Sequence, residues 1–190
     1  MVVTIYADRP ATAVANAAAM LAASFARAGA HRVALIAHAT PTEVPGDVAF
    51  HAMSATDANA FPALLVALRR QHDIIVLAPA HGSSEHTFLA LDHADNVLLL
   101  SDLSVAALRD LQRTLRLCVS LGHPYDKPRV VLHGVNAGGD VAPNEAAAAV
   151  KREIYWQLPA LDSPAAAENM DGLALKLIAE KRLGDRRLND

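Results

Sequence analysis

Val2-Val3-Thr4-Ile5-Tyr6 stands at the start of the sequence, followed by the turn Ala7-Asp8-Arg9-Pro10 and an alanine-rich segment from Ala11 to Ala28. The first run is short and mostly apolar, which is typical of a buried strand. The alanine-rich segment contains no internal glycine or proline, so it predicts a long helix. The rest of the fold is built outward from this strand, turn and helix.

The turn between this strand and helix has the position of a phosphate site but not its chemistry. In nucleotide-binding α/β proteins, glycines at this turn let backbone N–H groups surround an anion at the helix N-terminus. The present turn contains neither glycine nor lysine. Asp8 would add a negative charge beside a phosphate, and Pro10 has no N–H to donate. We therefore predict that Asp8, Arg9 and Pro10 mark a degenerate phosphate site.

The composition indicates a globular protein with one core. The chain has 190 residues, 53% of them apolar and 19% charged, so we expect a single domain over residues 1–190. The net charge of −3 provides no basic field for nucleic acid. The single cysteine, Cys118, falls in the apolar pattern of a helix, which predicts a buried reduced thiol and a cytoplasmic protein. No signal sequence opens the chain, and no uncharged run is long enough to span a bilayer.

Strands and helices alternate along the remaining sequence. The predicted strands after the first are Arg32–Ala37, Val48–Met53, Asp73–Ala78, Asn96–Ser101, Arg129–His133 and Ile154–Gln157. The predicted helices run from a cap at Asp57 to Gln71, from Glu85 to His93, from a cap at Ser104 to Leu121, from Asn144 to Arg152, near Ala165, and from Leu173 to Leu183.

This alternation predicts the fold class and the place where a ligand would bind. Continuous apolar strands separated by helices indicate an α/β fold, a three-layer sandwich with a mostly parallel central sheet. Ligands of such sheets bind beyond the carboxyl ends of the strands. The loops of interest thus follow Tyr6, Ala37, Ala78, Ser101 and His133.

Two stretches carry a resemblance to a known family. The first is Asp73-Ile74-Ile75-Val76-Leu77-Ala78-Pro79-Ala80-His81-Gly82 with Ala90-Leu91-Asp92-His93-Ala94-Asp95-Asn96-Val97-Leu98-Leu99. The second is Arg129 to Asn136, together with Trp156-Gln157-Leu158-Pro159. In segment order and in these motifs the chain resembles the ParA/MinD superfamily of deviant Walker ATPases, which has a P-loop NTPase fold. Among its branches the chain is most similar to the CpaE/TadZ pilus-assembly proteins.

The chain departs from this family where the family performs its chemistry. The resemblance implies a phosphate loop with glycines and two lysines, and this chain has neither. Only Thr12 and Asn16 resemble the family's residues at the start of the following helix. It implies an acidic residue after the second strand, where Ala37 and His38 stand, and a Walker B aspartate, where Ala78 stands. Without these groups nothing stabilises the charge of phosphoryl transfer, so we expect ATP and Mg²⁺ binding to be lost and no cofactor to be needed. Asn136, near the adenine in related ATPases, is the one plausible relic of the nucleotide site.

The resemblance implies a role in spatial organisation. Family members mark a cell pole or membrane site as dimers and recruit machinery. The expected function is that of a non-catalytic pseudo-ATPase that localises or assembles a pilus or secretion apparatus through protein partners, with membrane or pole association through them. We expect a homodimer formed by the turns Ala37 to Thr40 and Ala78 to Gly82. The chain starts at its first strand, so the N-terminal receiver domain of longer relatives is expected to be absent.

A second reading of the sequence is a small-molecule hydrolase or binder. It would use His81, Ser83, Ser84 and His86, which follow the predicted strand Asp73–Ala78 at the carboxyl edge of the sheet. The Gly-x-Ser-x-Gly elbow of serine hydrolases is absent, which favours Ser83 or Ser84 as a helix cap. His81 and His86, with Asp92 or Asp95, match no metal-ligand spacing, so no metal site is predicted.

The C-terminal segment also has two readings. Leu173 to Asp190 combines apolar residues with Lys176, Lys181, Arg182, Arg186 and Arg187. MinD proteins end in a membrane-binding amphipathic helix, so the resemblance implies that peripheral membrane contact is conceivable. Glu180, Asp185 and Asp190 dilute the positive charge, which favours an ordinary helix docked on the protein.

Overall fold

The computed structural model describes residues 1–7, 10–29, 31–135 and 137–187. The strands are β1 Val2–Tyr6, β2 Val33–Ala37, β3 Val48–Ala52, β4 Ile74–Ala78, β5 Asn96–Ser101, β6 Pro128–Leu132 and β7 Ile154–Gln157. The helices are α1 Ala11–Arg27, α2 Phe61–Gln71, α3 Glu85–His93, α4 Val105–Ser120, α5 Pro143–Val150 and α6 Ala165–Arg187, with 3-10 turns at Met53–Ala55 and Ala58–Ala60.

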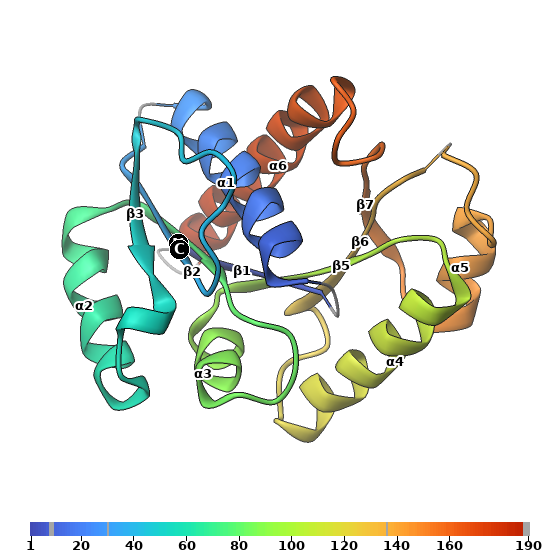
Figure 1. The fold of residues 1–190 in the computed structure, drawn as a ribbon, viewed down its shortest axis with the longest axis horizontal. Coiled ribbons are helices and arrows are strands. Elements are labelled where there is room, and N and C mark those ends of the chain that lie inside the picture. Colours follow the sequence, from blue (N-terminus) through green and yellow to red (C-terminus); the bar gives the residue numbers. More distant parts are fainter. Residues whose placement is uncertain (8–9, 30, 136, 188–190) are drawn as a thin grey trace.

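The described strands form a seven-stranded sheet in the order β3-β2-β4-β1-β5-β6-β7, and every pair of neighbours is parallel. Parallel neighbours need crossover connections, which the helices supply. Helices cover both faces of the sheet (Figure 1). The predicted α/β fold, a three-layer sandwich with a parallel central sheet, is confirmed.

The two helical layers pack against opposite faces of the same strands. Val3 and Ile5 of β1 belong to the apolar cluster that includes α1 and α6. Val2 packs on the other face with α2, and Tyr6 packs there with α4. Thr4, the polar residue of the strand, is buried and donates a hydrogen bond from Oγ1 to the Ala90 carbonyl at 2.7 Å. Because both faces are covered, β1 has no solvent side, which explains why it is mostly apolar and why its one threonine side chain is hydrogen-bonded.

The C-terminal segment differs from its prediction. The two expected pieces, near Ala165 and from Leu173 to Leu183, form one continuous helix, α6. The helix continues through Gly172, where the absence of a side chain lets the helix pack closely on Trp156. A Cβ there would lie 3.0 Å from a ring carbon of Trp156. Leu173 and Leu177 are buried in the same cluster as α1, so these residues dock on the protein.

Leu175 and Leu183 of α6 remain exposed. Peripheral membrane contact through this helix therefore stays a prediction. Across the described part of the chain, no helix combines the length and apolar character needed to cross a bilayer.

The start of α2 also differs from its prediction. Asp57 does act as a cap, since its Oδ1 accepts the Asn59 N–H at 2.7 Å, but it caps the 3-10 turn Ala58–Ala60. The α-helix begins only at Phe61. A helix starting at Ala58 would need an N–H donor from residue 62, and Pro62 has none.

A buried histidine lies at the opposite edge of the sheet from the predicted ligand site. The side chain of His123, which follows α4, is 4% exposed, and its Nε2 lies 3.7 Å from Oδ1 of Asp92. Neither ring nitrogen makes a hydrogen bond to the described residues. Burial lowers the pKa of His123 below its usual value, Lys127 lowers it further, and Asp92 opposes both. The native fold thus favours the neutral imidazole.

We expect the protein to lose stability as the pH falls below about 6.5, where histidines of the unfolded chain take up protons. The pKa of His123 is lower in the folded state, so its contribution is complete above the unfolded pKa and is lost as the pH falls through the folded one. His123→Gln should flatten the dependence of urea unfolding on pH between pH 7 and 5. His81→Gln, a change at an exposed histidine, should leave that slope unaltered, and equal slopes for all three proteins would contradict the assignment.

Candidate functional site

The candidate site lies at the carboxyl end of the central strand β1. β1 is flanked by β4 on one side and β5 on the other. The chain leaves β1 toward β2 and later crosses from β4 to β5, which makes the carboxyl end of β1 the topological switch point. Ala7 is buried there, and α1 begins at Ala11. The predicted site residues Asp8 and Arg9 lie outside the described residues.

The N-terminus of α1 has no side-chain cap. Pro10 occupies the capping position, and its carbonyl accepts the Ala13 N–H at 2.9 Å. Thr12 is exposed in the first turn. The free N–H groups of a first turn attract anions in general, but proline at the entrance donates nothing to one.

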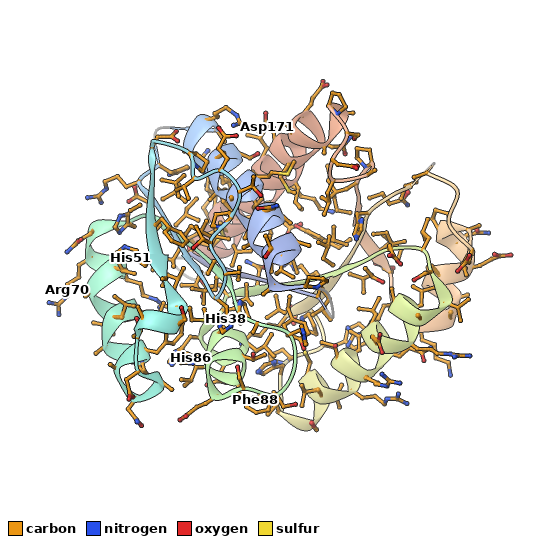
Figure 2. The ribbon with its side chains drawn as sticks, viewed as in Figure 1. His38, His51, Arg70, His86, Phe88 and Asp171 are labelled. Atoms are coloured by element: carbon orange, nitrogen blue, oxygen red, sulfur yellow. The ribbon has the colours of Figure 1, made fainter. Side chains whose placement is uncertain are left out.

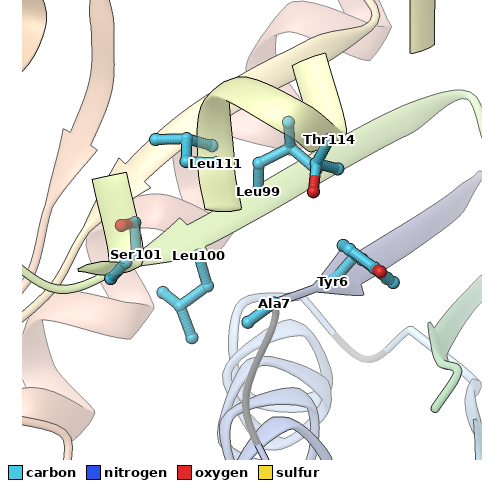
Figure 3. A pocket seen from close by; sticks show the side chains of 8 residues that line it. Tyr6, Ala7, Leu99, Leu100, Ser101, Leu111 and Thr114 are labelled. Atoms are coloured by element: carbon cyan, nitrogen blue, oxygen red, sulfur yellow. The ribbon is translucent and has the colours of Figure 1, made fainter. Parts of the chain in front are cut away.

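Two hollows flank Ala7 on opposite faces of the sheet. The larger, of about 240 Å³, opens on the side of α1 and is lined by Ala7, Pro10, Ala13, Val14, Leu100, His133 and Leu161. The smaller, of about 10 Å³, lies under α4 and has room for about one water molecule. Figure 3 shows the hydroxyls of Ser101 and Thr114 among the apolar side chains around it. Of the described residues that line the larger hollow, only His133 can carry a charge.

The ends of β2 and β4 present methyl groups at this edge. Ala37 and Ala78 are both buried and stand opposite each other in the sheet register. The N–H of His38 donates to the Ala78 carbonyl at 2.9 Å, which joins the two strand ends. These are the positions where the resemblance expects acidic residues. Among the residues that the structure describes, no group of three or more histidine, cysteine or acidic side chains could hold a metal ion.

Asn16 joins α1 to the loop after β2. Its Oδ1 accepts the Thr42 N–H at 2.7 Å, and its Nδ2 donates to the Thr42 hydroxyl at 3.1 Å. A side-chain amide that matches a backbone N–H and a hydroxyl fixes the loop on the helix. Asn16, an apparent echo of the nucleotide motif in the sequence, thus has a structural role.

The loop after β4 is held by its own hydrogen bonds. Ser84 caps α3 by accepting the Thr87 N–H at 3.1 Å, as predicted for Ser83 or Ser84. The Thr87 hydroxyl donates to the Ala80 carbonyl at 3.0 Å. Gly82 has a φ of +93°, which favours glycine, and its N–H donates to the Tyr6 hydroxyl at 3.0 Å. Tyr6 therefore connects the end of β1 to the loop after β4.

Two residues of the alternative hydrolase site, Ser84 and His86, make structural contacts in the fold. His86, shown in Figure 2, lies with Nε2 2.9 Å from the Thr56 carbonyl oxygen and packs against the Phe61 ring. Ser84 is the helix cap, whereas His81 and Ser83 are exposed in the loop. The contacts of Ser84 and His86 are those of a helix cap and of a histidine bound to a backbone carbonyl, and not those of a nucleophile and its base.

The glycine-bearing turn after β6 is explained by packing. A Cβ on Gly139 would lie 2.4 Å from the Leu103 Cβ, so a larger residue there would displace the loop. The Val141 N–H donates to the Leu103 carbonyl at 3.2 Å, which holds the turn against that residue. Asn136, the predicted relic of an adenine contact, lies outside the described residues. Leu161, which lines the larger hollow, had no sequence signal because it comes from a loop after β7.

No model of a known protein family matches this sequence, and no curated protein matches it. Solved structures do match. MinD in the MinC:MinD cell division complex of Aquifex aeolicus superposes with a TM-score of 0.75 at 15% identity, covering 94% of this chain and 95% of that one. A ParA family ATPase from Chlorobium tepidum gives 0.74 at 13%, covering 92% and 97%. MinD of Pyrococcus horikoshii, complexed with Mg-ADP, gives 0.71 at 11%, covering 93% and 95%.

The chain has the MinD/ParA fold. Nearly the whole length is matched in both directions, so the likeness concerns the complete sheet and its helices. The predicted P-loop NTPase architecture is confirmed at this level. Identities of 11–15% carry the fold and not the chemistry. The CpaE/TadZ branch and the loss of nucleotide binding stay predictions.

Tyr6→Phe tests the connection between β1 and the loop after β4. Removing the hydroxyl leaves the Gly82 N–H without its acceptor, so we expect a loss of about 1 kcal/mol in unfolding free energy. Amide hydrogen exchange at Gly82 should become faster. Tyr125→Phe is the matched control, because its side chain is 70% exposed, and it should change neither quantity. Unchanged exchange at Gly82 in Tyr6→Phe would refute the connection.

Proposed function

We propose that this protein is a pseudo-ATPase, a non-catalytic localisation or assembly factor on a MinD/ParA-type scaffold. The observation that supports this function is the composition of the carboxyl edge. The hollow beside Ala7 is bounded by apolar side chains and His133, and the ends of β2 and β4 present the methyl groups of Ala37 and Ala78.

Electrostatics explains why this edge is unsuited to a nucleotide. A triphosphate with its magnesium ion carries several charges that must be stabilised when they leave water. Catalysis needs preorganised cations and donors at the transferred phosphoryl group, and a carboxylate to hold the metal. Alanine at both strand ends supplies neither. A methyl-lined edge favours apolar contacts instead.

The proposed role is to act through protein partners in the cytoplasm. The MinD of Aquifex aeolicus has been solved in complex with MinC, which shows a protein of this fold bound to a partner. By the resemblance of its motifs to CpaE/TadZ proteins, the present chain would serve a pilus or secretion apparatus. It would reach a membrane or cell pole through its partners.

Titration calorimetry with ATP and ADP, each with Mg²⁺, tests the loss of nucleotide binding. We expect no binding heat, corresponding to a Kd weaker than about 1 mM. The MinD of Pyrococcus horikoshii, whose structure holds Mg-ADP, is the positive control under the same conditions. Micromolar binding of either nucleotide by the present protein would overturn the pseudo-ATPase proposal.

Dimerisation would use the turns after β2 and β4. His38 and Thr40 are exposed at the first turn, and His81 and Gly82 at the second. The hydrogen bond from His38 to the Ala78 carbonyl makes the two turns neighbours, so together they offer one surface. The same edge would sandwich the nucleotide in an active relative.

His38→Glu would place charges facing each other in a symmetric dimer through this edge. We expect light scattering and sedimentation to give a dimer mass for the natural protein and a dissociation constant raised at least about tenfold by the substitution. Val66→Glu adds the same charge at an exposed position of α2 and should have no effect. A monomer at high concentration, or equal weakening by both substitutions, would refute this interface.

A further inference from the structure

Besides the two hollows beside Ala7, another hollow lies at the amino edge of the sheet, opposite the candidate nucleotide site. It has a volume of about 490 Å³, within the usual range of ligand pockets. It is formed by the segment before β6, the start of β7 and the middle of α6. Figure 1 shows β6 and β7 at the end of the sheet remote from α2.

Two cations in this hollow form no salt bridge with any residue that the structure describes. The Arg152 guanidinium lies 3.5 Å from the centre of the Tyr125 ring and donates to the Tyr125 carbonyl. The Lys176 Nζ lies 3.9 Å from the centre of the Tyr155 ring and donates to the Tyr155 carbonyl at 3.0 Å. Within the described chain, neither forms a salt bridge with a carboxylate. Both charges are held in place by aromatic rings and carbonyls but not neutralised.

The third cation of the hollow is neutralised. Arg129, like Lys176, lies over the Tyr155 ring, with its guanidinium carbon 4.5 Å from the ring centre. It forms a salt bridge with Glu180. This leaves Arg152 and Lys176 as the half-buried charges without a counter-charge.

The carboxylates of the hollow do not cancel this excess. Asp126 and Glu153 also line it, but both are exposed, so solvent screens their charge. Arg152 and Lys176 are half-buried, where the effective dielectric is lower and a charge acts more strongly on a neighbour. The lining holds three basic and three acidic side chains, and among them Arg152 and Lys176 are the less exposed charges that form no salt bridge with the described residues.

We propose that this hollow, defined by Tyr125, Arg152, Tyr155 and Lys176, binds an acidic segment of a protein partner. Carboxylates of the segment would accept hydrogen bonds from Arg152 and Lys176. The Tyr125 ring, 70% exposed beside Arg152, would give an apolar contact to the side chain that follows. Tyrosine and arginine are two of the residue types enriched among those that contribute most binding energy at protein interfaces. The inference relies on the proposed function only for the choice of a protein as the occupant.

The probe is a fluorescein-labelled peptide of alternating glutamate and leucine, followed by anisotropy with the full-length protein at low salt. We expect saturable binding that weakens as salt is added. Arg152→Gln and Lys176→Gln should each weaken it about tenfold, the loss of one charge-assisted hydrogen bond. Arg70→Gln makes the same charge change on distant α2, where Figure 2 shows the side chain, and should leave the affinity unaltered. Thermal melts of each variant identify any that fail to fold, and the two site variants provide independent tests.

Three results would overturn the proposal. The first is the absence of peptide binding, and if pyrophosphate binds in that case, the occupant is a free phosphate. The second is equal binding of the peptide with glutamine in place of glutamate, and the third is equal weakening by Arg70→Gln and the site variants. Calorimetry with nucleotides concerns the opposite edge, so failure of one proposal is distinguishable from failure of the other.

Discussion

Burial of β1 on both faces is the constraint on which the rest of the structure depends. The strand lies between β4 and β5, under α1 and α6 on one side and α2 and α4 on the other. Fully burying each of its larger apolar side chains contributes about 1.5–3 kcal/mol. A central parallel strand must also have its backbone groups paired on both edges, which β4 and β5 provide. Its carboxyl end is therefore held at the switch point whatever chemistry the following turn contains.

This constraint separates the architecture of the candidate site from its chemistry. The strand ends meet because of burial and pairing, so Ala37 and Ala78 lie opposite each other without any ligand. An aspartate at either position would be buried among apolar groups, and an unpaired buried carboxylate is strongly unfavourable. Active relatives of such a fold need a metal or donors to offset that cost. Alanine at both positions avoids this cost, so the two strand ends can pack without a metal or a donor beside them.

The sequence predicted the elements whose signals are local. The bounds of β1, α3 and β5 agree with the prediction, because apolar runs, a serine cap and turn residues mark both ends. The carboxyl edge as the place of the candidate site followed from the alternation of strands and helices, whereas the switch point at the end of β1 depends on the strand order, which the sequence did not predict. The continuous α6 was not predicted, because Gly172, which lies inside the helix, packs against Trp156, and that packing depends on the fold. Nor could the amino-edge hollow, because Tyr125, Arg152 and Lys176 come from three separate segments that only the fold brings together.

The carboxyl and amino edges of the sheet differ in the charge of the side chains that they present. At the carboxyl edge, small apolar groups replace the expected charges, so the edge is inexpensive to fold. At the amino edge, Arg152 and Lys176 are half-buried and form no salt bridge with the described residues, which costs stability unless other contacts compensate. The rings of Tyr125 and Tyr155 each offset about 0.5–2 kcal/mol of this cost by cation–π contact. Stability alone would be served better by apolar residues there, so the cations are most simply explained by an acidic partner.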